Sequence, residues 1–379
     1  MKALQRLSGI GLALAGLLSA ASADASPYSQ VNLVSSVPGL AQFTDPVLIN
    51  PWGMSFSPTS PFWLSDQGTG VSTLYRVTNG VVTKPALTVT IPTTPAPGPE
   101  GPTGQVFNNT TGFTLPTGGS PATFIFASLN GTISAWNGAQ GTAAVVTATT
   151  PGAVYTGLAL SNDANGARLF AVNGASGSID AFDSSFAPIS LPAGFVNPDA
   201  RIANLGLVPF NAEVFNGKVY VTYAPAGRNA QISAAEGSGA VAIFDTNGNY
   251  LQTLTIGGKL ASPWGLAVAP SNFGSFSGDV LVGNFSFDVS EINAYDPITG
   301  EYRGTLVDID GNTLLNPGLW DIAFGNTSAG TNILYFNAGI QGETQGLFGS
   351  IAAIPEPEPL LLLGLGFAAL ALRRSRRPR

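Results

Sequence analysis

The chain has 379 residues, of which 44% are hydrophobic and only 10% charged, and its formal net charge is −7. It contains no cysteine and no histidine, which excludes disulfides, thiol nucleophiles, Cys/His zinc sites and imidazole-based serine triads. The 47 glycines and 28 prolines follow no collagen period, and the apolar content is too high for a disordered chain.

Residues 1–23 predict a secretory signal peptide. Lys2 and Arg6 precede an uncharged apolar run, and the small residues Ala21 and Ala23 occupy the two positions that signal peptidase reads. The alternative is a buried N-terminal helix, but its charges would be interleaved with the apolar positions. We therefore expect export by the secretion machinery and cleavage by signal peptidase.

The body that follows contains repeated strand-rich units. Similar openings occur in NPWGMSFSP at residue 50, SPWGLAVAP at 262 and NPGLWDIAFG at 316, with a weaker copy, YTGLALS, at 155. Further alternating segments rich in β-branched and aromatic residues follow each opening, and Gly, Asn, Asp and Pro mark the turns between them. We expect the tryptophans of these openings to pack between units, although they could also stack sugars.

Six such units predict that residues 24–353 form an all-β, six-bladed β-propeller. The blades are expected to start near residues 46, 103, 153, 204, 262 and 315. The alternative is a pair of β-sandwiches, which would not require the recurring openings. The irregular unit 78–121 includes TIPTTPAPGPEGPTG, which we expect to be a loop rather than a strand.

The last unit shows only three strands, so the ring needs another one. Gln30–Val34 alternates and has no other expected partner. We therefore predict that it supplies the outer strand of the last blade.

One polar residue ends the second strand of each unit, and in a propeller these ends lie on the same face as the unit openings. The six residues are Asp66, Ser128, Asn173, Tyr223, Asn284 and Asn337. Such oxygens could bind Ca²⁺, as in lactone-hydrolysing propellers, or could simply cap turns. Because only one of the six is a carboxylate, we expect turn caps, with no metal, no cofactor and no catalytic residue.

The body is acidic. Between the two terminal signals it keeps eight basic and 20 acidic residues, a formal charge of about −12. Nucleic acids and anionic lipids require a basic face, so neither is an expected partner of the body.

Residues 354–379 form a distinct tail. Pro355-Glu356-Pro357 precedes 13 uncharged residues, which would rise about 20 Å as a helix against a hydrocarbon core of about 30 Å. The chain then closes with Arg373, Arg374, Arg376, Arg377 and Arg379. The arginines should stay cytoplasmic, which would give an anchored intermediate in the inner membrane.

This order of features resembles the PEP-CTERM sorting tail of Gram-negative bacteria. The resemblance implies that an exosortase-type enzyme is the processing partner, and that the mature protein reaches the cell surface or the extracellular space. The alternative is an ordinary single-span transmembrane anchor.

The body resembles exported bacterial NHL-like propeller proteins that have no assigned reaction. The resemblance rests on FIFASLNGTISAWNG, GKVYVTYA, SPWGLAVAPSNFGSFSGDVLVGNF and NPGLWDIAFG, and it spans most of residues 28–353. The sequence departs from the family after Gly283-Asn284-Phe285, where Ser286-Phe287-Asp288-Val289 replaces a Gly-rich acidic turn.

These features favour a surface or extracellular-matrix binding or scaffold protein, with a surface polysaccharide or matrix component as partner. The alternative function is a divalent-metal-dependent, lactonase-like hydrolase that uses the mouth of the propeller channel.

Overall fold

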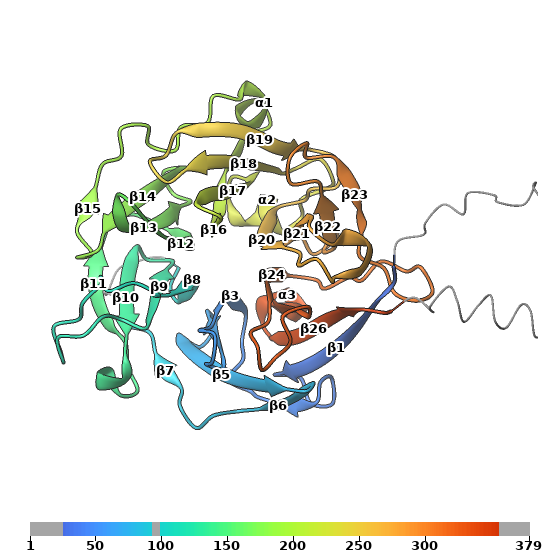
Figure 1. Cartoon of the computed structure of the whole chain (residues 1–379), viewed down its shortest axis with the longest axis horizontal. Coiled ribbons are helices and arrows are strands. Elements are labelled where there is room, and N and C mark those ends of the chain that lie inside the picture. The colour runs from blue at the N-terminus through green and yellow to red at the C-terminus, as the bar shows by residue number, and fades with distance from the viewer. Residues whose placement is uncertain (1–25, 93–98, 356–379) are drawn as a thin grey trace, which may run out of the picture.

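Each predicted unit folds into one sheet whose strands are antiparallel, apart from the short parallel pair of β1 (Tyr28–Ser35) and β2 (Phe43–Thr44), and six sheets surround a central axis (Figure 1). The coordinates are a computed structural model that describes residues 26–92 and 99–355. The all-β, six-bladed propeller is confirmed. The signal peptide, and the sorting tail beyond Pro355, lie outside the described residues.

The first five sheets follow one another along the chain. Sheet one holds β3 (Pro51–Ser55), β4 (Phe62–Asp66), β5 (Val71–Thr78), β6 (Val81–Thr83) and β7 (Val89–Thr90). Sheet two holds β8 (Pro102–Phe107), β9 (Phe124–Ser128), β10 (Thr132–Trp136) and β11 (Val145–Thr149). Sheet three holds β12 (Tyr155–Asp163), β13 (Gly166–Asn173), β14 (Ser178–Asp183) and β15 (Pro188–Ile189). Sheet four holds β16 (Leu207–Phe215), β17 (Lys218–Pro225), β18 (Ala240–Asp245) and β19 (Tyr250–Ile256). Sheet five holds β20 (Pro263–Val268), β21 (Val280–Asn284), β22 (Ile292–Tyr295) and β23 (Tyr302–Thr305).

Sheet six joins the two ends of the body. It holds β24 (Leu319–Phe324), β25 (Leu334–Ala338) and β26 (Leu347–Ala353), followed by β1 (Tyr28–Ser35) and β2 (Phe43–Thr44). β1 pairs antiparallel with β26, with Val31 opposite Ser350. The predicted closure by Gln30–Val34 is therefore confirmed, and the observed strand extends beyond it on both sides.

Helices are few and short among the described residues. They are α1 (Ala200–Asn204), α2 (Arg228–Ile232) and α3 (Ile340–Glu343), with 3₁₀ turns at Gly138–Gln140 and Gly274–Phe276. α2 connects the second and third strands of sheet four, and α3 connects the corresponding strands of sheet six.

The prediction that residues 90–104 form a loop is wrong at both ends of this range, which belong to strands. Thr90 belongs to β7, and Pro102 opens β8 opposite Ser128. A proline is tolerated as the first residue of a strand, and Pro51 and Pro263 open equivalent strands of other sheets. The Pro-rich composition therefore concealed a real strand start, while residues 93–98 are not described.

The innermost strands approach one another closely around the axis. A Cβ atom added to Gly104 would lie 2.3 Å from the Leu158 backbone nitrogen, so only glycine fits there. The Thr103 hydroxyl donates to the Tyr155 carbonyl at 2.7 Å, and the Asn211 amide donates to the Trp264 carbonyl at 3.0 Å. These contacts between neighbouring sheets explain why the openings recur in the sequence.

Candidate functional site at the channel mouth

Aromatic side chains fill the centre of the ring at the start of the innermost strands. All six of these strands carry a register irregularity near their start: five directly after the opening residue, and β16 after its third residue, Pro209. Trp52 and Trp320 stack with their ring centroids 3.5 Å apart, and Trp264 lies edge-on to Trp320 at 5.7 Å. Phe210 and Phe285 complete this buried aromatic cluster. The tryptophans thus pack against one another, as the sequence predicts.

Arg228, the first residue of α2, lies against this cluster. Its guanidinium carbon is 4.1 Å from the ring centroid of Phe285, 4.8 Å from that of Trp320 and 5.1 Å from that of Trp52. A guanidinium at this distance is attracted by the negative face of an aromatic ring. The aromatic cluster and the helix therefore fix the position of this cation.

Glu343, on α3 of sheet six, pairs with Arg228, on α2 of sheet four. Arg228 Nε donates to Glu343 Oε2 at 3.2 Å, and Nη2 donates to Oε1, which makes the pair bidentate. Figure 1 shows α2 and α3 beside the central opening. Arg228 Nη1 is buried without a hydrogen-bond partner among the residues that the structure describes.

The backbone that presents Glu343 is strained. Gln341, Gly342 and Glu343 have φ values of 52°, 66° and 66°, which lie in the left-handed region. This region costs a non-glycine residue roughly 1–2 kcal/mol. Such strain is commonly found where the surrounding structure holds a functional group in place, here the carboxylate that neutralises Arg228.

A cavity of about 340 Å³ opens beside the Arg228–Glu343 pair. Its lining combines apolar surface with amide side chains, and its charged members are those two residues. The lining residues are Asn50, Trp52, Gln67, Pro99, Leu129, Val154, Thr156, Gly174, Ala175, Gly227, Arg228, Gln231 and Glu343. We call this space the mouth cavity.

The amides of the mouth cavity differ in how they are bonded. Asn50 accepts from Trp320 Nε1 at 2.9 Å and donates to Gln67 at 2.8 Å, while Gln67 donates to the Glu100 carbonyl at 2.7 Å. These bonds fix both side chains. Within residues 26–92 and 99–355 the Gln231 side chain has no hydrogen-bond partner, which leaves its donors and its acceptor open to a ligand.

The six residues of the predicted polar ring lie at repeat-equivalent positions. Five of them are strand partners of a residue at or near the start of the innermost strand. The sixth, Asn337, accepts a hydrogen bond through its side chain from the Asp321 backbone N–H at 2.7 Å. All six are buried, and none lines the mouth cavity. The structure therefore brings them to one end of the sheets but does not gather them around an open site.

Several ring side chains bond to the backbone of their own sheet. Asn173 accepts from the Val154 N–H at 3.2 Å, and Asp66 accepts from the Thr73 N–H at 3.0 Å. Burial raises the pKa of the Asp66 carboxyl well above its usual range. In the described part of the chain no three acidic side chains form a group that could hold a metal ion.

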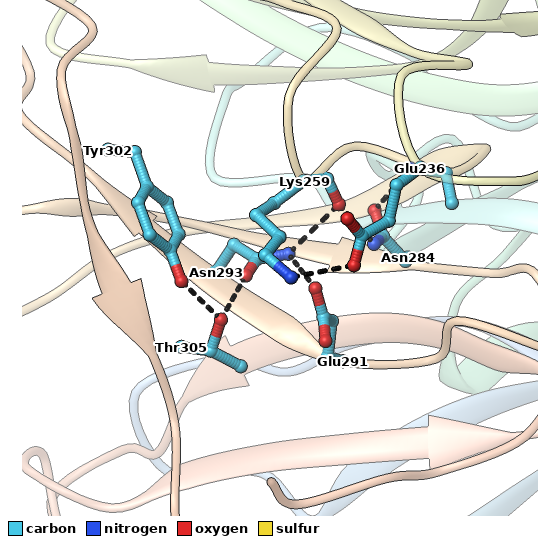
Figure 2. Close-up of polar contacts among 8 residues, drawn as sticks. Glu236, Lys259, Asn284, Glu291, Asn293, Tyr302 and Thr305 are labelled. Atoms are coloured by element: carbon cyan, nitrogen blue, oxygen red, sulfur yellow. Dashed lines mark hydrogen bonds and ion pairs between the residues drawn. The ribbon is translucent and has the colours of Figure 1, made fainter.

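Asn284 belongs to a polar network in sheet five, drawn in Figure 2. The side chains of Asn284 and Asn293 donate to the Lys259 carbonyl at 2.8 and 3.3 Å, and Lys259 Nζ lies 2.7 Å from Glu236. Asn293 also donates to Glu291 at 3.2 Å, and burial raises the pKa of that carboxyl. The network fixes the loop that leads into β20.

Two carboxylates face a second cavity of about 280 Å³, which lies deeper along the innermost strands. Asp321 accepts from the backbone N–H groups of Met54 and Ile322 at 2.7 and 2.8 Å. Burial raises the pKa of Asp321 to about 7, and burial together with the nearby Asp321 charge raises the pKa of Glu213. Sequence reasoning missed this pair because the two acids lie in different blades.

The family comparison concerns the tail. Residues 353–377 match the PEP-CTERM protein-sorting motif. The chain therefore carries a sorting signal that implies export, a membrane-anchored intermediate and an exosortase-type processing partner. In the part of the chain with described coordinates, no helix has the length and apolar character to cross a membrane.

Relatives and solved structures resemble the body. Uncharacterized proteins L690 and R648 of Acanthamoeba polyphaga mimivirus are each 28% identical to this chain over 329 residues. Each match covers 84% of this chain, and it covers 84% of L690 and 78% of R648. The apo soluble aldose sugar dehydrogenase of Escherichia coli is 11% identical with a TM-score of 0.53, over 86% of this chain and all of its own. A Bacteroides thetaiotaomicron protein of unknown function is 12% identical with a TM-score of 0.51, over 86% and 76%. The likeness to these two structures concerns the fold alone.

Proposed function

We propose that this exported, tail-sorted propeller is a cell-surface or extracellular-matrix binding protein that holds a small ligand, or one unit of a larger one, in the mouth cavity. The observation that carries the proposal is the combination of an open cavity, a fixed Arg228–Glu343 pair and an unbonded Gln231 amide. Concave sites with apolar walls and a few placed polar groups are the usual form of ligand-binding sites.

Binding without turnover suits these lining residues. Arg228 is bonded to Glu343 and stacked on aromatic rings, so neither charged group is free to act as an acid or a base. Thr156 donates its hydroxyl proton to the Phe210 carbonyl at 2.7 Å and has no base beside it among the lining residues. The arrangement favours holding a ligand over reacting with it.

A ligand screen by thermal shift on the exported protein tests this proposal. A true ligand should raise the melting temperature, because binding to the native state alone stabilises it by RT ln(1 + [L]/Kd). The shift should shrink in Gln231→Leu and persist in Glu213→Gln, a change in the deeper cavity. A shift that Gln231→Leu leaves unchanged, or that Glu213→Gln abolishes, would contradict a site at the mouth.

A further inference from the structure

We propose that the ligand of the mouth cavity is an uncharged saccharide unit. This inference rests on the proposed binding function and names the class of molecule that the same site takes.

The charge balance of the mouth cavity disfavours ions. Its one cation and one anion neutralise each other in a bidentate pair that leaves only Arg228 Nη1 without a described partner, and the side chains of Arg228 and Glu343 are only 32% and 18% exposed. A charged ligand would have to break this pair or leave its own charge uncompensated in a partly buried place. The acidic body repels anions in addition.

The polar groups suit hydroxyls. The Gln231 amide offers donors and an acceptor that no described side chain or backbone group uses. A sugar hydroxyl both donates and accepts, so it can satisfy either end of an amide, whereas a purely apolar ligand would leave this amide without a partner. The ligand should therefore be rich in hydroxyl groups and carry no net charge.

The apolar lining suits the carbon-bound hydrogens of a sugar ring. Pro99, Leu129, Val154 and Ala175 contribute aliphatic surface to the lining. The volume of about 340 Å³ lies near the lower end of the range of about 300–1,000 Å³ for ligand sites. One sugar ring, with the adjoining sugars of the chain extending into solvent, fits this volume better than a long saccharide inserted along the propeller axis.

The test compares neutral and acidic sugars on the exported protein. Isothermal titration uses neutral tetrasaccharides of glucose, galactose and mannose alongside tetragalacturonate. We expect at least one neutral tetrasaccharide to bind and tetragalacturonate not to bind. Gln231→Leu should weaken neutral binding about five- to tenfold through the lost hydrogen bond. Gln42→Leu, at an exposed amide that bonds to Gly80 away from the cavity, should leave binding unchanged.

A second variant tests the charge argument. Glu343→Gln leaves Arg228 without its counter-ion, so the cavity gains a net positive charge and should now accept tetragalacturonate, with an affinity that falls as salt rises. Its melting curve shows whether it folds, and Gln231→Leu gives an independent reading if it does not.

The outcomes separate the two proposals. Tight, salt-sensitive binding of tetragalacturonate to the parent would overturn the uncharged class while leaving a binding site at the mouth. Failure of every saccharide, with a different ligand found in the thermal screen and lost in Gln231→Leu, would overturn the saccharide alone. Failure of all ligands in both experiments would overturn the binding function as well.

Discussion

Arg228 and Glu343 lie 115 positions apart in the sequence yet form a bidentate ion pair at the channel mouth. Each sits on a short helix inserted between the second and third strands of its blade. These two insertions contribute Arg228, Gln231 and Glu343 to the lining of the mouth cavity.

The coupling between these two residues is measurable. We expect a double-mutant cycle of Arg228→Met and Glu343→Gln to give an interaction free energy of about 1–2 kcal/mol in chemical unfolding. This interaction free energy is smaller than that of a fully buried charged pair, because both side chains are partly exposed and water screens their charges. Strictly additive losses would show that the pair contributes nothing as a unit.

Close packing of the innermost strands gives a second prediction. Gly104→Ala should destabilise the protein by about 1–3 kcal/mol, because the new Cβ would overlap the Leu158 backbone. Gly138→Ala is the matched control, since a Cβ there meets no atom within 4 Å and its effect should stay within about 0.5 kcal/mol. Chemical unfolding curves of the two variants measure these losses. Equal losses of stability in the two variants would contradict close packing of Gly104 against Leu158.

Much of this ring could be predicted from the sequence, for a physical reason. Trp52, Trp264 and Trp320 recur because three of the six blades place a tryptophan at the same position near the axis. β1 could be predicted because the last unit lacked a strand. The mouth cavity was not foreseen. Its two charged lining residues, Arg228 and Glu343, lie on insertions that do not repeat between blades, so no periodicity marks them.

The pair formed by the buried Asp321 and the half-buried Glu213 predicts an unusual pH dependence. The pKa of Asp321 is raised to about 7 in the folded protein, above its unfolded value near 3.8. The stabilisation that protonated Asp321 gives the folded protein is therefore fully present below about pH 4. It is lost as the pH rises toward 7, and above that the stability no longer changes through this group.

Glu213→Gln removes the like charge and should raise the melting temperature at pH 8 while flattening its decline between about pH 4 and 7. Glu301→Gln, at an exposed acid, is the matched control and should reproduce the parent profile. Parallel profiles in parent and Glu213→Gln would show that the two carboxyls do not interact.

The calcium hypothesis for the polar ring has its own test. We expect Ca²⁺ to leave the melting temperature of the parent unchanged. Asp66→Asn should be neutral or slightly stabilising, because the amide oxygen can still accept from the Thr73 N–H without a buried charge. A calcium-dependent rise in the parent that disappears in Asp66→Asn would instead favour the metal-dependent hydrolase.

Tail sorting should carry the body to the outside of the cell. Intact-mass measurement of the protein recovered from the cell surface and the medium tests this directly. The account predicts that the mass lacks the signal peptide and the arginine cluster of residues 373–379, which follows the sorting motif's Pro355-Glu356-Pro357. Recovery of exported protein that retains Arg379 would contradict it.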